Sequence, residues 1–196
     1  MWLSGFFPIA LLQGLVIIFG MYFASDTLGY FGFAVLVVAN MAMFKDVSLS
    51  LYLPKLIHRY STKKILDKAL LARAILFGLV PVLVMLICIF LMQSTLQRVL
   101  PEKLSQDVFT FIYILGFSQI FMAMYQPIFR LLSALGFHTR VLIISLVLLA
   151  CLLSLYVLFG TMGNPYYMAA SSGIVSFMAL LISLKMLNQI TVLLND

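Results

Sequence analysis

Six apolar stretches recur along this chain, and they constrain its fold more than any other feature. They cover residues 5–24, 28–53, 74–92, 108–129, 141–160 and 166–184. A helix needs about 20 apolar residues to cross the hydrocarbon core of a bilayer, and its backbone groups then hydrogen-bond within the helix. The sequence therefore predicts an all-α, polytopic membrane protein, with six transmembrane helices in one domain over residues 1–196.

Composition excludes a soluble globular fold. Hydrophobic residues make up 64% of the chain and charged residues only 9%, whereas an average soluble domain has about a quarter charged residues. A soluble protein of this size must cover its surface with polar groups. The chain lacks enough of them, so we expect lipid to cover much of its surface.

The charges predict an orientation. The connection over residues 54–73 has one acid, Asp67, and six basic residues, which are Lys55, Arg59, Lys63, Lys64, Lys68 and Arg73. The fourth connection adds Arg130 and Arg140. Because basic residues collect on the cytoplasmic side, both connections and both termini are predicted to be cytoplasmic. The 54–73 segment is either an amphipathic helix or loop that binds anionic lipid, or a topology determinant alone.

Signatures of enzymes and of cofactor sites are missing from the sequence. It contains no phosphate-binding glycine loop, no paired carboxylates on one helical face and no nucleophile with a histidine partner. Cys88 and Cys151 lie in separate apolar stretches, and both histidines lie in connections. We therefore expect no enzymatic activity, no cofactor, no metal and no nucleic-acid partner.

The few polar residues inside the stretches are the candidates for a functional site. Most are uncharged: Gln13, Asn40, Ser118, Gln119, Gln126, Ser171, Ser172 and Ser176. Lys45 and Asp46 are the charged exceptions, and ionisable residues within a membrane are functional candidates. The alternative is that Lys45 reaches the interface while Asp46 neutralises it. Arg130 is either an anchor at a helix end or a residue that binds an anion.

Small residues four apart in the sixth stretch predict a closely packed helix partner. Ala169 pairs with Gly173 in this spacing, and Ser172 pairs with Ser176. Such pairs let a neighbouring backbone approach closely. The spacing alone leaves open whether the partner helix belongs to this chain.

Several motifs occur in the order found in one transporter family. They are residues 28–34 (LGYFGFA), 52–54 (YLP), 78–81 (GLVP), 129–136 (FRLLSALG) followed by Arg140, and 159–171. In this order they resemble the carboxy-terminal lobe of bacterial polysaccharide or O-antigen flippases, which belong to the multidrug/oligosaccharidyl-lipid/polysaccharide exporter superfamily. The resemblance covers nearly the whole chain.

The resemblance implies a function at the bacterial cytoplasmic (inner) membrane. Such flippases move a lipid-linked oligosaccharide, carried on undecaprenyl diphosphate, to the periplasmic leaflet by alternating access. A diphosphate head group needs a polar, positively biased cavity to replace its water. Lys45 and Arg130 could bind the diphosphate, and Asp46 lies beside Lys45 in sequence.

The chain departs from this family in its length. Flippases of this family have two six-helix lobes, and residues 1–196 correspond to one. We therefore expect a partner lobe, supplied by a second copy or by a separate amino-terminal half. Two alternatives remain open: half of a cation-coupled drug exporter, for which Asp46 is the available carboxylate, and a non-transporting membrane assembly subunit.

Overall fold

The fold is all-helical, as the sequence predicts. The computed structural model describes residues 14–63, 68–99 and 102–193. Within these ranges 97% of the residues are helical and none lies in a strand. The helices are α2 (Leu15–Tyr22), α3 (Ser25–Lys63), α4 (Lys68–Val99), α5 (Glu102–Leu132), α6 (His138–Thr161) and α7 (Pro165–Leu193), with a π-helical segment, η2 (Ser133–Phe137), between α5 and α6.

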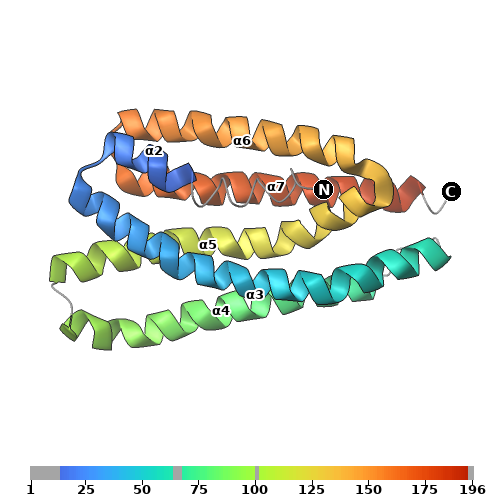
Figure 1. Cartoon of the computed structure of the whole chain (residues 1–196), viewed down its shortest axis with the longest axis horizontal. Helices are drawn as coiled ribbons and strands as arrows, with labels where there is room; N and C mark the ends of the chain where they lie inside the picture. Colours follow the sequence, from blue (N-terminus) through green and yellow to red (C-terminus); the bar gives the residue numbers. More distant parts are fainter. Residues whose placement is uncertain (1–13, 64–67, 100–101, 194–196) are drawn as a thin grey trace.

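The long helices form an elongated bundle around α5. In Figure 1, α3, α5 and α7 run in one direction, and α4 and α6 run in the opposite direction. α5 packs against α3, α4 and α7, while α6 packs mainly against α7. The short α2 lies against α3 and α6 at the end where α6 finishes. α5 is thus the central helix of the described bundle.

Four stretches of the described residues are long and apolar enough to cross a membrane. They are Ser25–Met43, Lys68–Thr95, Gln106–Thr161 and Pro165–Gln189. The third contains 56 residues and includes both α5 and α6, which fold back on each other (Figure 1). Only 11% of an 18-residue apolar segment within Lys68–Thr95 is buried inside the chain, so the rest of that apolar surface requires an apolar environment. The chain is a membrane protein by these criteria.

The count of six transmembrane helices stays a prediction. Residues 5–13 of the first predicted stretch, 5–24, lie outside the described residues, and α2 belongs to the second half of that stretch. The other five correspond to α3 through α7, and each helix extends beyond its apolar stretch at one end or both. Helix bounds exceed the apolar stretches because polar residues continue a helix into the interface once its turns are formed.

Within the connection predicted over residues 54–73, the described residues are helical and belong to two elements. α3 continues through Pro54 to Lys63, and α4 already begins at Lys68. Proline removes one backbone donor and commonly ends a helix. Here the turns beyond it have packing partners: Leu56 is buried in a cluster with Leu70, Leu71, Ala74 and Leu131. This tertiary packing extends α3 well past the predicted end of its apolar stretch.

Aromatic rings connect α2, α3 and α5 in the core. The rings of Phe19 and Phe31 are stacked with centroids 4.1 Å apart. Phe111 of α5 meets Phe31 edge-on, with the centroids 5.4 Å apart. All three side chains are buried. Offset-stacked and edge-on pairs of this kind add about 0.5–1.5 kcal/mol each beyond their buried area.

The turn between α5 and α6 depends on a glycine. Gly136, inside η2, has a φ of 96°, in the left-handed region that only glycine adopts without strain. A Cβ atom at this position would meet no other atom within 4 Å. The requirement for glycine is therefore one of backbone conformation and not of space.

This difference predicts opposite effects for two glycine substitutions. Gly136→Ala should destabilise the protein by roughly 1–2 kcal/mol, because alanine is strained at positive φ. Gly32→Ala, inside α3, where a Cβ would also meet nothing within 4 Å, should be neutral or stabilise by up to about 1 kcal/mol through helix propensity. The fraction of monodisperse protein after heating in detergent measures both effects. Equal thermal stability of the two variants would contradict this account.

Candidate functional site

Two of the predicted site residues form an ion pair. The guanidinium Nη2 of Arg130 donates a hydrogen bond to Oδ1 of Asp46 over 2.9 Å, although the residues are 84 positions apart. The side chain of Arg130 is 37% exposed and that of Asp46 is 55% exposed. The pair therefore connects α5 to α3 and remains accessible from outside the described bundle.

The position of the pair follows from the two helices. Asp46 lies three residues beyond Met43, where the apolar stretch of α3 ends, so it is about 5 Å further along the helix axis. Arg130 lies in the last turn of α5. Because α3 and α5 run in the same direction (Figure 1), both residues reach the same end of the apolar region. The positive charge of Arg130 also interacts favourably with the negative, carboxy-terminal end of the α5 helix dipole.

Lys45 is the third predicted site residue. Its backbone belongs to α3, next to Asp46. Its side chain lies outside the described part of the chain, so its predicted role stays a prediction. The described part of the site consists of Arg130 and Asp46.

A polar stripe on α5 leads from Arg130 into the bundle. Gln126 and Gln119 lie four and eleven residues before Arg130, and at 100° per residue all three fall within about 40° of one another around the helix. Gln126 is 4% exposed and Gln119 is fully buried. The Oε1 atom of each has no hydrogen-bond partner within the described part of the chain. The stripe extends about 16 Å along α5.

Three further buried oxygen atoms lack a partner among the described residues. They belong to Ser176 of α7 and to the hydroxyl groups of Tyr125 and Tyr156. Other buried polar groups are satisfied locally: Ser172 Oγ, for example, donates to the carbonyl of Ala169 over 2.8 Å. Unpaired polar groups are costly in an apolar interior. Of the five unpaired groups, three lie on α5, one on α7 and one, Tyr156, on α6, so most of those in the described part of the chain lie on α5 and α7.

The small residues of α7 pack within this chain. A Cβ atom built on Gly173 would lie 3.9 Å from Cβ of Ser118 on α5, and Ala169, Ser172 and Ser176 are buried. α5 is therefore a helix partner of this face of α7. This answers the question that the four-residue spacing leaves open.

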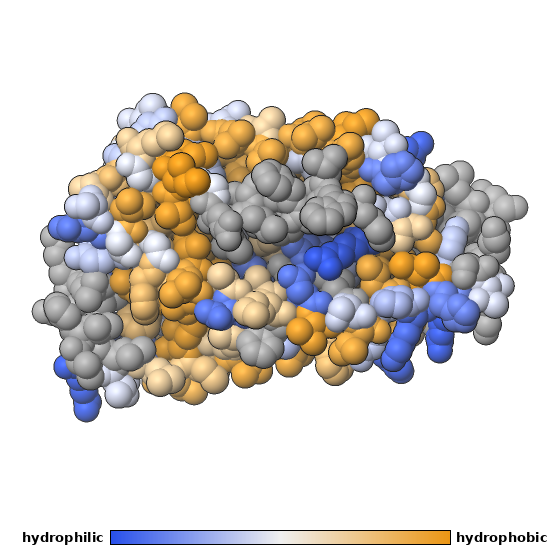
Figure 2. Space-filling view, in the orientation of Figure 1, coloured by the Kyte–Doolittle hydropathy of each residue, from blue (hydrophilic) through white to orange (hydrophobic). Residues whose placement is uncertain are grey.

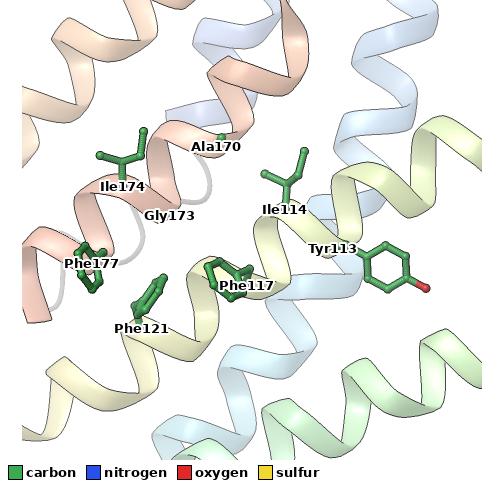
Figure 3. A pocket seen from close by; sticks show the side chains of 8 residues that line it. All are labelled: Tyr113, Ile114, Phe117, Phe121, Ala170, Gly173, Ile174 and Phe177. Atoms are coloured by element: carbon green, nitrogen blue, oxygen red, sulfur yellow. The ribbon is translucent and has the colours of Figure 1, made fainter.

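An apolar groove lies beside the α5–α7 contact. It encloses about 650 Å³, and Figure 3 shows its aromatic walls, Phe117 and Phe121 from α5 and Phe177 from α7, with Ala170 and Gly173 on α7. Tyr113, at one end, donates its hydroxyl to Gln93 over 2.6 Å. The groove contains no charged side chain. It suits hydrocarbon and not a sugar or a phosphate.

Charges are distributed unequally between the two ends of the bundle. α3 and α7 finish, and α4 and α6 begin, at one end (Figure 1). The described basic residues there are Lys55, Arg59, Lys68, Arg73, Arg140 and Lys185. The opposite end has Asp26, Asp107 and Arg98. Figure 2 shows hydrophilic atoms at both ends and, near the middle of this face, beside the grey residues. Arg130 and Asp46 thus lie toward the basic end.

The Arg130–Asp46 geometry suits the binding of an anion. A guanidinium group has five N–H donors, and in the described residues Arg130 uses one group, Nη2, in a single contact. Phosphate is a favoured partner of arginine because its oxygens accept two parallel hydrogen bonds.

Among the described residues no cluster of three or more His, Cys, Asp or Glu could hold a metal ion.

Sequence reasoning missed two polar contacts between helices. Tyr166 of α7 donates its hydroxyl to Asp107 of α5 over 2.7 Å, and Tyr113 donates to Gln93 of α4. The partners are 59 and 20 residues apart, so helical spacing gives no signal for either contact. The stripe could have been found, because Gln119, Gln126 and Arg130 follow helical spacing in the sequence.

No protein-family model matches the sequence, and no curated protein or solved structure matches it. The relation to the polysaccharide flippases therefore stays a prediction.

The ion pair is expected to contribute modestly to stability. A partly exposed pair contributes about 0.2–1 kcal/mol, so Asp46→Asn and Arg130→Gln should each lower the free energy of unfolding slightly. The double variant should then be less destabilised than the sum of the two. A double-mutant cycle on thermal stability in lipid nanodiscs measures the coupling. Strictly additive effects would show that the two side chains do not interact.

Proposed function

We propose that this chain is a transporter lobe that moves a lipid-linked oligosaccharide across the bacterial inner membrane, with Arg130 as the group that binds its diphosphate. The accessible Arg130–Asp46 pair, at the end of the apolar region, is the observation that supports this proposal best. The motif order described above supports the choice of substrate class. The lobe itself would comprise six transmembrane helices.

Arg130 could exchange partners during transport. In the resting lobe Asp46 occupies one side of the guanidinium. An incoming diphosphate has more oxygen acceptors and more charge than one carboxylate, so it competes for the same donors. Asp46 keeps the guanidinium paired when no substrate is present, which lowers the cost of a cation near hydrocarbon.

The distribution of charge supports a cytoplasmic position for the loading side. The basic residues of α3, α4, α6 and α7 gather at the end toward which Arg130 lies. Under the positive-inside rule that end faces the cytoplasm, as do both termini. A lipid-linked oligosaccharide assembled in the cytoplasm would then meet Arg130 from the side on which it is made.

A second lobe is part of the proposal. Alternating access requires two bodies that rock against each other around a central site, and the described bundle is one body organised around α5. A second copy of this chain or a separate amino-terminal half would supply the other. The exposed positions of Arg130 and Asp46 leave the pair available to a cavity between two lobes.

The two alternatives have less support from the geometry. A cation-coupled drug exporter requires a carboxylate free to bind the coupling ion, and Asp46 is engaged by Arg130. An assembly subunit would be favoured by an unpartnered helix-packing face, but the small residues of α7 are buried within this chain. Neither alternative explains a polar stripe on the central helix.

The role of Arg130 can be tested in a deletion strain that accumulates lipid-linked oligosaccharide in the cytoplasmic leaflet. Arg130→Gln should reduce rescue of export by about tenfold to a hundredfold, the effect of losing a charge-assisted hydrogen bond of about 1.5–3 kcal/mol. Arg130→Lys should retain part of the activity. Arg140→Gln is the matched control, because it removes an exposed positive charge of the same end and should leave export unchanged.

Two results would contradict the proposal. Full export with Arg130→Gln, at wild-type protein levels, would exclude Arg130 as the diphosphate ligand. Normal export in the deletion strain, in the absence of a redundant flippase, would exclude the flippase function. Rescue that requires co-expression of an amino-terminal lobe would identify the second body as a separate chain, and rescue by this chain alone would favour a homodimer.

A further inference from the structure

The interior of the bundle contains oxygen atoms that the described helices do not satisfy. Gln119 and Gln126 of α5 and Ser176 of α7 are each more than nine-tenths buried, and each has an oxygen without a partner within the described part of the chain. In hydrocarbon each such group costs several kcal/mol. A membrane protein retains polar groups of this kind where they line a water-filled cavity or meet a polar ligand.

Two of these groups lie in line with Arg130 on α5. Gln119, Gln126 and Arg130 share one face of α5, and the half-exposed guanidinium stands at its outer end. Ser176 comes from the helix that packs most extensively on α5. Within the described residues Gln119 donates to the sulfur of Met122, over 3.4 Å, and this sulfur is a weak acceptor. The amide oxygens are thus available along a stripe that begins at the ion pair.

The chemistry of the stripe changes along its length. Its outer end has a cation, and the inner part has neutral amide and hydroxyl groups, each able to donate and to accept hydrogen bonds. A sugar phosphate has the same order of groups, with an anion at one end and neutral hydroxyl groups beyond it. A free phosphate would match the outer end alone.

We propose that Gln119, Gln126 and Ser176 line a hydrated path inside the lobe and hydrogen-bond the sugar hydroxyls of a head group whose phosphate binds Arg130. The sugar-binding part rests on the proposed function, whereas the hydrated path does not. Water fills the path when the sugar is absent, and the Arg130–Asp46 pair stands at its mouth.

Cysteine labelling tests for the path. The chain has two cysteines, Cys88 and Cys151, and serine replacements give a background without thiols. Gln126→Cys and Ser176→Cys are then introduced singly, and the nearly isosteric Ser176→Cys guards against misfolding at Gln126. Phe117→Cys is the matched control, because it lies on α5 but faces the apolar groove and is 57% exposed. The reagent is a charged methanethiosulfonate, applied to the protein in lipid nanodiscs.

We expect cysteines at the two buried positions to be labelled faster than the cysteine at the exposed position, Phe117. The thiolate is the reactive species, and a thiol surrounded by hydrocarbon ionises poorly, with each unit of raised pKa lowering the thiolate fraction tenfold. Gln126→Cys and Ser176→Cys should therefore react at least about tenfold faster than Phe117→Cys. Labelling of both at or below the rate of Phe117→Cys would overturn the path.

Protection by ligands tests the sugar. Hexose 1-phosphates and N-acetylhexosamine 1-phosphates are added one at a time, with inorganic phosphate at the same concentration as the control. At least one sugar phosphate should slow labelling of Gln126→Cys severalfold more than phosphate does, and Arg130→Gln should abolish the difference. Equal protection by phosphate, or no protection by any sugar phosphate, would overturn sugar binding along the stripe.

The outcomes also separate this inference from the proposed function. Fast labelling and sugar protection in a chain that fails to restore export would leave the path standing and exclude the flippase. Restored export by a chain in which neither Gln126→Cys nor Ser176→Cys is labelled would support the flippase function and exclude the hydrated path.

Discussion

In hydrocarbon every backbone amide must form its hydrogen bond within its own helix, and the rest of this structure depends on that requirement. It accounts for the helical content of the described residues and for the continuation of helices through Pro54, Pro81 and Pro127. It also explains why a true break in the backbone, at Gly136, comes after the last turn of α5, between the predicted stretches 108–129 and 141–160. Since lipid offers no hydrophobic drive for helices to associate, packing shape must hold the bundle together.

Helix existence was predictable from the sequence, because an apolar stretch of about 20 residues permits few structures. Helix length was not. The second stretch was predicted over residues 28–53 and the segment after it as a helix or a loop, whereas burial of Leu56 against α4 extends α3 to Lys63. Such tertiary contacts join residues that are distant in sequence, so no local pattern reveals them.

The candidate site, too, could be predicted from the sequence only in part. Arg130 and Asp46 could each be selected as charges in an apolar chain, but their pairing depends on how α3 and α5 lie side by side. Gln119 and Gln126 could be placed on one helical face by counting, yet that they are buried and unpaired could not be known without the fold. Residue type and helical spacing predict which side chains are polar in an otherwise apolar helix and which of them share a face. The packing of helices decides which of them meet.

α3 is 39 residues long, about 58 Å, nearly twice the thickness of the hydrocarbon core. Asp46 divides it into an apolar half and a half that ends in basic residues. The second half extends about 25 Å from Asp46 to Lys63. Because Leu56 in this half packs against Leu70 and Leu71 of α4 and Leu131 of α5, the basic end of α3 is held to the bundle beyond the ion pair.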